Sequence, residues 1–194
     1  MSHIARRILL IEQEYPRRLA LKSALKAAGF EPCGEAAGAD EAAELARSLR
    51  PDAVLMGGEA GKRGLQQLRE LASLQIAPLI YLSPAPEQAA EAAKAGAYAV
   101  LPRMAEAELI LPALEVACAR FAERQALRRE TEDLRDLLAL RKTLDQAKGI
   151  LMRQYHMSEQ EAHRRIQRYA MHKRLTVKSV AEAIVKATGG KANK

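Results

Sequence analysis

Three short, uninterrupted apolar runs constrain the fold of the first 120 residues more than any other feature. They are Ile8–Ile11, Ala53–Met56 and Leu79–Leu82. Runs of this length are typical of strands that are buried on both faces of a parallel sheet. Two weaker strands are predicted at 31–35 and near 98–101, the first at a sheet edge because it contains a proline.

Between these strands, apolar residues recur at helical spacing. Helices are predicted at 17–28, 40–49, 65–74 and 86–95, and a further helix opens near Glu106. Asp40 is the expected N-cap of the second helix. Strands that alternate with helices over short connections predict a doubly wound parallel sheet of five strands, in the order 2-1-3-4-5, over residues 1–119.

The connection that follows is predicted to be one long helix. No Gly precedes Gly149 and no Pro follows Pro112 in the stretch from 106 to 152. Leucines recur there at intervals of three, four and seven residues, which favours a coiled-coil linker at 120–144 and a homodimer. Glu130, Thr131 and Arg141 interrupt the seam, so a helix that packs only on its own domains is the alternative.

Residues 138–188 are predicted to form three helices. The first continues from the linker and ends near Tyr155, the second begins at Ser158 with an S-x-x-E capping box, and the third is capped by Thr176. Tyr169 and Met171 are predicted to belong to the core of this domain, and an exposed ring that stacks on a ligand is the alternative for Tyr169. The Gly/Lys/Asn-rich segment 189–194 is predicted to be a disordered tail.

Charge divides the chain in the same way. Residues 1–119 hold 13 Lys/Arg and 15 Asp/Glu, a net charge of −2, whereas residues 120–194 hold 18 and 9, a net charge of +9. This asymmetry indicates two domains with different roles, the second suited to a polyanion. A solvated basic helix without any partner is the alternative.

The residues at the ends of the predicted strands can be compared with those of a known family. Residues 1–119 resemble the receiver domain of bacterial response regulators, which has the flavodoxin-like (CheY-like) fold. In that family, strand one ends in two acids, strand three in a phosphorylated Asp, strand four in Ser/Thr and strand five in Lys-Pro, with an aromatic in strand five. The corresponding residues here are Glu12 and Gln13, Gly57, Ser83, Arg103 followed by Met104, and Val100.

These departures remove the chemistry of the receiver family. A glycine at 57 supplies no carboxylate nucleophile, and Glu12 beside the neutral Gln13 is a poor ligand set for Mg²⁺. Glu59 lies two residues too late to replace the missing Asp. We therefore expect a pseudo-receiver without phosphorylation, catalysis, metal or cofactor, in which Ser83 and Arg103 have structural roles.

The last domain resembles the ANTAR domain. The pattern is carried by "AKGILM" at 147–152, "EA" at 161–162, "AM" at 170–171 and "VA" at 180–181. The order of domains is similar to that of the AmiR/NasT group, and it implies a transcription antiterminator that binds stem-loop leader RNA and prevents terminator formation. The candidate RNA-binding residues are Lys148, Gly149, Arg153, Arg164, Arg168, Lys173, Arg174 and Lys178.

The same resemblance implies the partners. They are hairpins of a leader mRNA, the RNA polymerase elongation complex indirectly, and a ligand-sensing negative regulator that resembles a periplasmic binding protein. A DNA-binding response regulator with a helix-turn-helix is the alternative. No run approaches 18 apolar residues, so we expect a cytoplasmic protein without a membrane segment. Cys33 and Cys118 lack any paired spacing, and no disulfide is expected.

Overall fold

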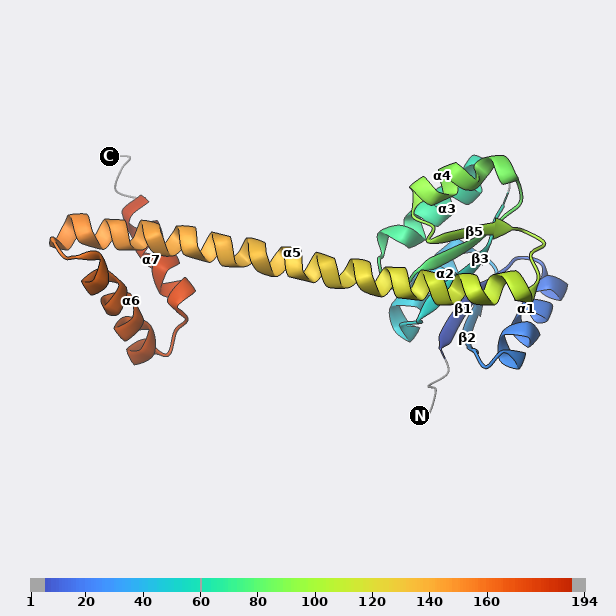
Figure 1. Ribbon diagram of the computed structural model, residues 1–194, viewed down its shortest axis with the longest axis horizontal. Helices are drawn as coiled ribbons and strands as arrows, with labels where there is room; N and C mark the ends of the chain where they lie inside the picture. Colours follow the sequence, from blue (N-terminus) through green and yellow to red (C-terminus); the bar gives the residue numbers. More distant parts are fainter. Residues whose placement is uncertain (1–5, 60, 190–194) are drawn as a thin grey trace. The chain divides into compact units, whose positions relative to one another are not determined.

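Five parallel strands form one sheet in the order β2-β1-β3-β4-β5, which confirms the predicted topology (Figure 1). The computed structural model describes residues 6–59 and 61–189. The chain divides after Gln125 into an N-terminal unit and a C-terminal unit, which are described separately. The strands are β1 (Arg7–Ile11), β2 (Glu31–Ala36), β3 (Ala53–Gly57), β4 (Leu79–Ser83) and β5 (Ala99–Pro102).

Helices cover both faces of the sheet, as in a doubly wound fold (Figure 1). One face packs on α2 (Ala39–Leu49), α3 (Lys62–Ser73) and α4 (Ala89–Ala95), and the other on α1 (Tyr15–Ala27) and the first turns of α5 (Ala107–Tyr155). Successive residues of a strand point to opposite faces, and here both faces are apolar. This explains why the strands read as continuous apolar runs and not as alternating patterns.

The sheet also positions the candidate receiver site. Because all five strands are parallel, the residues that follow β1, β3, β4 and β5 meet at one edge of the sheet. Glu12, Gly57, Ser83 and Arg103 come from segments far apart in the sequence, and each lies at the carboxyl end of its strand or directly after it.

One local prediction for the N-terminal unit was wrong, that of Asp40 as a cap, and another, the helix at 86–95, was right except for the type of its first turn. Helix 86–95 begins as a short 3₁₀ turn, η1 (Pro86–Gln88), and only then becomes α4. Asp40 is not the N-cap of α2, because the helix begins at Ala39 with Gly38 before it. Asp40 instead lies in the first turn, where a negative charge favours the helix dipole.

The C-terminal unit is a small helical bundle. The 49-residue helix α5 ends at Tyr155 as predicted, and α6 (Glu159–Lys173) and α7 (Val177–Gly189) pack beside its last turns (Figure 1). Despite the length of α5, no helix among residues 6–59 and 61–189 is apolar enough over a sufficient length to cross a membrane. The buried residues of the bundle core are Ala147, Leu151, Ala162, Ile166, Ala170, Val180 and Ala181.

Both predicted caps of this unit are confirmed. The Ser158 hydroxyl accepts a hydrogen bond from the Glu161 backbone N–H (3.3 Å), and the Glu161 carboxylate accepts one from the Ser158 backbone N–H (2.8 Å). The Thr176 hydroxyl accepts a hydrogen bond from the backbone N–H of Ser179 (3.1 Å). Each cap satisfies helix N–H groups that lack a partner within the helix.

Two side chains predicted to be in this core lie on the surface. Tyr169 is 53% exposed and Met171 is 74% exposed. The narrow buried stripe of α6 consists of Ala162, Ile166 and Ala170, spaced four residues apart, and both side chains lie beside this stripe. Gly189, placed in the tail from sequence, is the last residue of α7, and the rest of that tail lies outside the described residues.

Replacing Ser158 by Ala should destabilise α6 by about 1 kcal/mol, because the Glu161 backbone N–H loses its side-chain acceptor. The test is amide hydrogen exchange over 159–173, where protection should fall about fivefold. Hydrogen bonds from Ser158 hold the pKa of Glu161 below its usual 4.5. The capping contribution is therefore complete above pH 4.5 and is lost as the pH falls through that lowered pKa.

The neighbouring exposed Gln160 provides the control for this experiment, since its side chain makes no cap contact. Gln160→Ala should leave exchange over the same helix unchanged. Equal protection in Ser158→Ala and wild type would contradict the stabilising role of the capping box.

Candidate nucleic-acid interface and a closed receiver site

The Glu12 carboxylate lies at the centre of the former receiver site and is fully buried (0% exposed). Its Oε1 accepts hydrogen bonds from Arg103 Nη2 (2.8 Å) and from the Glu14 backbone N–H (3.1 Å). Its Oε2 lies 3.6 Å from Arg17 Nε, without a hydrogen bond. A buried charge is costly unless it is paired, so this glutamate depends on the two arginines.

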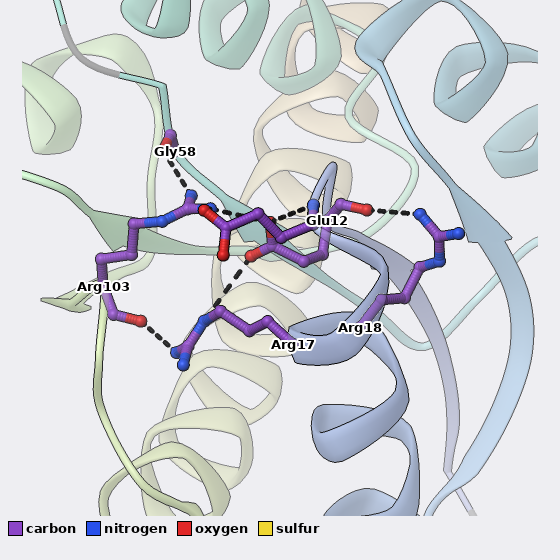
Figure 2. A network of polar contacts seen from close by, with 6 residues as sticks. Glu12, Arg17, Arg18, Gly58 and Arg103 are labelled. Atoms are coloured by element: carbon purple, nitrogen blue, oxygen red, sulfur yellow. Dashed lines mark hydrogen bonds and ion pairs between the residues drawn. The ribbon is translucent and has the colours of Figure 1, made fainter.

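Arginines hold this edge of the sheet together (Figure 2). Arg103 Nη1 donates to the backbone carbonyl of Gly58 (2.7 Å), and Arg17 donates to the backbone carbonyl of Arg103. Arg18 Nη1 donates to the Glu12 carbonyl (2.6 Å). The network joins the ends of β1, β3 and β5 to the first turn of α1.

Sequence analysis did not identify Arg17 and Arg18 as part of this site. The signal that could have found them is their position, one to two turns of helix after the acid at the end of the first strand. The structure places both arginines in the first turn of α1, where their side chains reach Glu12 at the end of β1.

Gly57 leaves no room for the missing phospho-acceptor. A Cβ at this position would lie 2.3 Å from Glu12 Oε2 and 3.3 Å from Arg103 Nη1. The adjacent Gly58 is equally restricted, because its Cβ would lie 2.3 Å from the Tyr81 ring. The space that a side chain at 57 would use is therefore occupied by the ion pair.

The other polar side chains at this edge of the sheet form hydrogen bonds or ion pairs with nearby residues. The Ser83 hydroxyl donates to the Ala85 carbonyl (2.8 Å). The Glu59 carboxylate lies 3.7 Å from Arg63, and its backbone carbonyl accepts from the Tyr81 hydroxyl (3.3 Å). Burial raises the pKa of Tyr81, so this hydroxyl remains a neutral donor at physiological pH.

The receiver fold implies a Mg²⁺ site here, and these residues do not fit one. Mg²⁺ requires several free oxygen ligands in near-octahedral geometry. The Glu12 oxygens face arginines, Gly57 offers no side chain, and Gln13 is a neutral amide. Across the part of the chain that the structure describes, no group of three or more Asp, Glu, His or Cys side chains could hold a metal ion.

The candidate nucleic-acid interface lies on the C-terminal unit, on one exposed side of α6. We call this the α6 face and define it by Arg164, Arg165, Arg168, Tyr169 and His172, which line a shallow pocket with Met157 and Glu161. Their spacing places them one to two helical turns apart on the same side. The Arg165 guanidinium stacks over the exposed ring of Tyr155, 4.5 Å from its centroid.

The predicted RNA-binding residues fall into separate places. Arg164 and Arg168 lie on the α6 face, and Gly149 and Arg153 line a groove between α5 and α7. Lys173, Arg174 and Lys178 are exposed around the turn that joins α6 to α7. Sequence analysis did not predict RNA binding by Arg141 and Lys142, which line the same groove as Gly149.

Lys148 differs from the other cations. Its Nζ lies 2.7 Å from Asp145 and 2.6 Å from Glu159, and its side chain is 14% exposed. The hydrogen bonds to Asp145 and Glu159 raise the pKa of Lys148. This lysine joins α5 to the start of α6, and its charge is already compensated within the chain.

Comparisons with known proteins agree with both parts of the chain. Residues 132–185 match the ANTAR domain. The chain is 37% identical over 189 residues to the transcriptional regulatory protein PdtaR of Mycobacterium tuberculosis, covering 96% of this chain and 92% of that protein. It is 32% identical over 89 residues to the aliphatic amidase regulator of Pseudomonas aeruginosa, covering 45% of each.

The N-terminal unit is also similar to solved receiver domains. One is the signal receiver domain of a modulated diguanylate cyclase from Desulfovibrio desulfuricans. The match has a TM-score of 0.52 at 23% identity and covers 62% of this chain and 98% of that domain. At this identity the similarity supports the fold alone.

Restoring an acid by Gly57→Asp should not restore phosphorylation. The new Cβ would collide with Glu12, and the new carboxylate would face a buried carboxylate. The expected result is no phosphate incorporation from acetyl phosphate by intact mass, together with a lower thermal midpoint of the N-terminal unit. Gly57→Ala separates size from charge and should lower the midpoint as well. Stoichiometric phosphorylation of a stable Gly57→Asp protein would contradict the closed site.

Proposed function

Because the chain belongs to the AmiR/NasT-type ANTAR-domain response regulators with a degenerate receiver domain, we propose that it is an RNA-binding transcription antiterminator. It binds stem-loop leader RNA and prevents formation of a terminator. The observation that carries this proposal is the α6 face, where three arginines that form no salt bridge with any described residue lie with the single acid Glu161 beside exposed aromatic rings. Cations supply affinity for phosphates, and aromatic rings stack on unpaired bases.

RNA fits this face better than duplex DNA does. Tyr155 and Tyr169 are each more than half exposed, and flat rings of this kind bind splayed bases in loops. In a DNA duplex the bases are stacked and offer only their edges to the grooves. The short turn between α6 and α7 is the feature that a DNA-binding helix-turn-helix would share, so duplex DNA is the competitor to test.

We propose that RNA binding is not controlled by phosphorylation of the N-terminal unit. The former receiver site contains the Glu12–Arg103 ion pair where an aspartate and Mg²⁺ would be needed. The N-terminal unit then acts as a docking platform for a ligand-sensing negative regulator that resembles a periplasmic binding protein. Release from that partner exposes the RNA-binding unit to the nascent transcript, and RNA polymerase is affected only through the RNA.

We also propose that two copies pair through α5. Leu127, Leu134, Leu137 and Leu138 are each between 54% and 65% exposed in the single chain. Leu127 and Leu134 are one heptad apart, and Leu137 follows at the next seam position. A helix that presents such a stripe to solvent buries it by pairing with an identical stripe on a second copy.

Tyr169→Ala should weaken binding to a two-hairpin leader RNA by about 5- to 150-fold, as expected for loss of one stacked base. Tyr169→Phe keeps the ring and should bind within about twofold of wild type, because stacking needs no hydroxyl. Arg168→Ala should lower the slope of log affinity against log salt by about 1. Filter binding or fluorescence anisotropy over a salt series measures all three.

The same titrations separate the alternatives. Wild-type affinity should be equal with and without acetyl phosphate, and unlabelled duplex DNA should compete poorly. Affinity that rises with acetyl phosphate would contradict phosphorylation-independent control. Effective competition by duplex DNA would favour the helix-turn-helix alternative.

Leu134→Glu should dissociate the dimer, because a charge would replace a leucine on the paired stripe. Sedimentation equilibrium should give the monomer mass, and affinity should fall more for a two-hairpin RNA than for a single hairpin. Arg135→Glu introduces the same side chain at the next exposed position, off the stripe, and should remain dimeric. A dimeric Leu134→Glu protein would rule out this seam.

A further inference from the structure

Gly149 occupies a position at which a glycine is not expected, the interior of a long helix. It lies inside α5, six residues before the end of a helix that is otherwise free of glycine. Glycine is the poorest helix former after proline. Gly149 also has no positive φ, unlike Gly29, Gly61 and Gly96 among the described residues. Helix geometry therefore gives no reason for a glycine at this position.

Packing within the chain gives no reason either. A Cβ at 149 would meet only Arg153 Nη1, at an ordinary contact distance of 3.8 Å. At Gly34, Gly57 and Gly64, by contrast, an added Cβ would approach another atom to 2.7 Å or less. Those glycines are explained by their neighbours in the fold, and Gly149 is not.

Gly149 lies in a groove of about 850 Å³ between α5 and α7, which we call the Gly149 groove. Arg141, Lys142 and Arg153 line it, and none of them forms an ion pair or a hydrogen bond with any residue that the structure describes. Asp145 is the acid of the lining; Lys148 pairs with it at 2.7 Å, and the charge of Arg141 also lowers its pKa. Three cations therefore line the groove beside one carboxylate that Lys148 already neutralises, and the groove keeps a net positive charge.

The walls of the groove differ from the α6 face in one respect. Apart from Leu138, which the proposed dimer covers, their apolar side chains are the aliphatic Ile150 and Val185, and no described residue of the lining is aromatic. Such a surface offers charge and close approach but nothing on which a base could stack. Its chemistry suits a sugar–phosphate backbone.

We propose that the Gly149 groove binds the sugar–phosphate backbone of the RNA, while the α6 face stacks its unpaired bases. The missing side chain lets a ribose or phosphate lie against the helix, and Arg141, Lys142 and Arg153 neutralise the adjacent phosphates. This assignment rests on the proposed RNA binding and divides it between two surfaces of the C-terminal unit.

The test fills the groove in the full-length protein and measures stability, RNA affinity and mass in parallel. Gly149→Ala should raise the thermal midpoint of the C-terminal unit by about 4–8 °C, because alanine favours the helix. The same variant should bind the two-hairpin leader RNA more weakly, and Gly149→Leu at least about tenfold more weakly. Arg153→Gln should lower the salt slope by about 1.

Ala139→Leu is the matched control, since it adds similar bulk to an exposed position of α5 that does not line the groove. It should bind RNA within about twofold of wild type. Gly149→Leu with wild-type RNA affinity would overturn the groove assignment and leave the proposed function intact. A change in sedimentation mass with unchanged affinity per protomer would assign the groove to a second copy. Wild-type protein that binds no leader RNA would overturn the proposed function itself.

Discussion

The buried carboxylate of Glu12 is the constraint on which the N-terminal unit depends. A charge removed from water must be neutralised nearby, and here Arg103 and Arg17 reach it from the end of β5 and from α1. The same arginines bond to backbone carbonyls of Gly58 and of Arg103 itself. The sheet edge at which ligands normally bind in this fold is held together by these contacts, and a Cβ at position 57 would collide with the Glu12 carboxylate of the ion pair.

Helix α5 is shared by the two units. Ile110, Leu114 and Ala117 belong to the core of the N-terminal unit, and Ala147 and Leu151 belong to the core of the C-terminal unit. Between these anchored ends, four of its leucines are exposed, namely Leu127, Leu134, Leu137 and Leu138. A helix that is integral to both cores, with an unpaired stripe between them, is suited to carry a coiled coil.

The basic residues of the C-terminal unit are not equivalent. Lys148 is held by Asp145 and Glu159 and contributes to the bundle. Within residues 6–59 and 61–189, the arginines of the α6 face and the cations of the Gly149 groove form no such salt bridge, so their charge remains available to a polyanion. A cation that is already paired gains less from binding a phosphate, because it must first give up its partner. Whether a basic side chain is already paired therefore indicates a role in RNA binding better than the number of basic residues in a segment does.

The sequence by itself determined the order of strands and helices, the parallel sheet, the two caps of the last domain and the loss of the phospho-acceptor. Those features depend on local periodicity and on single residues, such as the glycine at 57. Only the tertiary structure decided that Arg103 and Arg17 fill the receiver site, that Tyr169 is exposed, and that Lys148 is paired. Each of these depends on residues brought together across the fold or on which side of a narrow helical stripe a side chain lies. Spacing along the chain does not fix those contacts, because they arise only when the helices and strands pack.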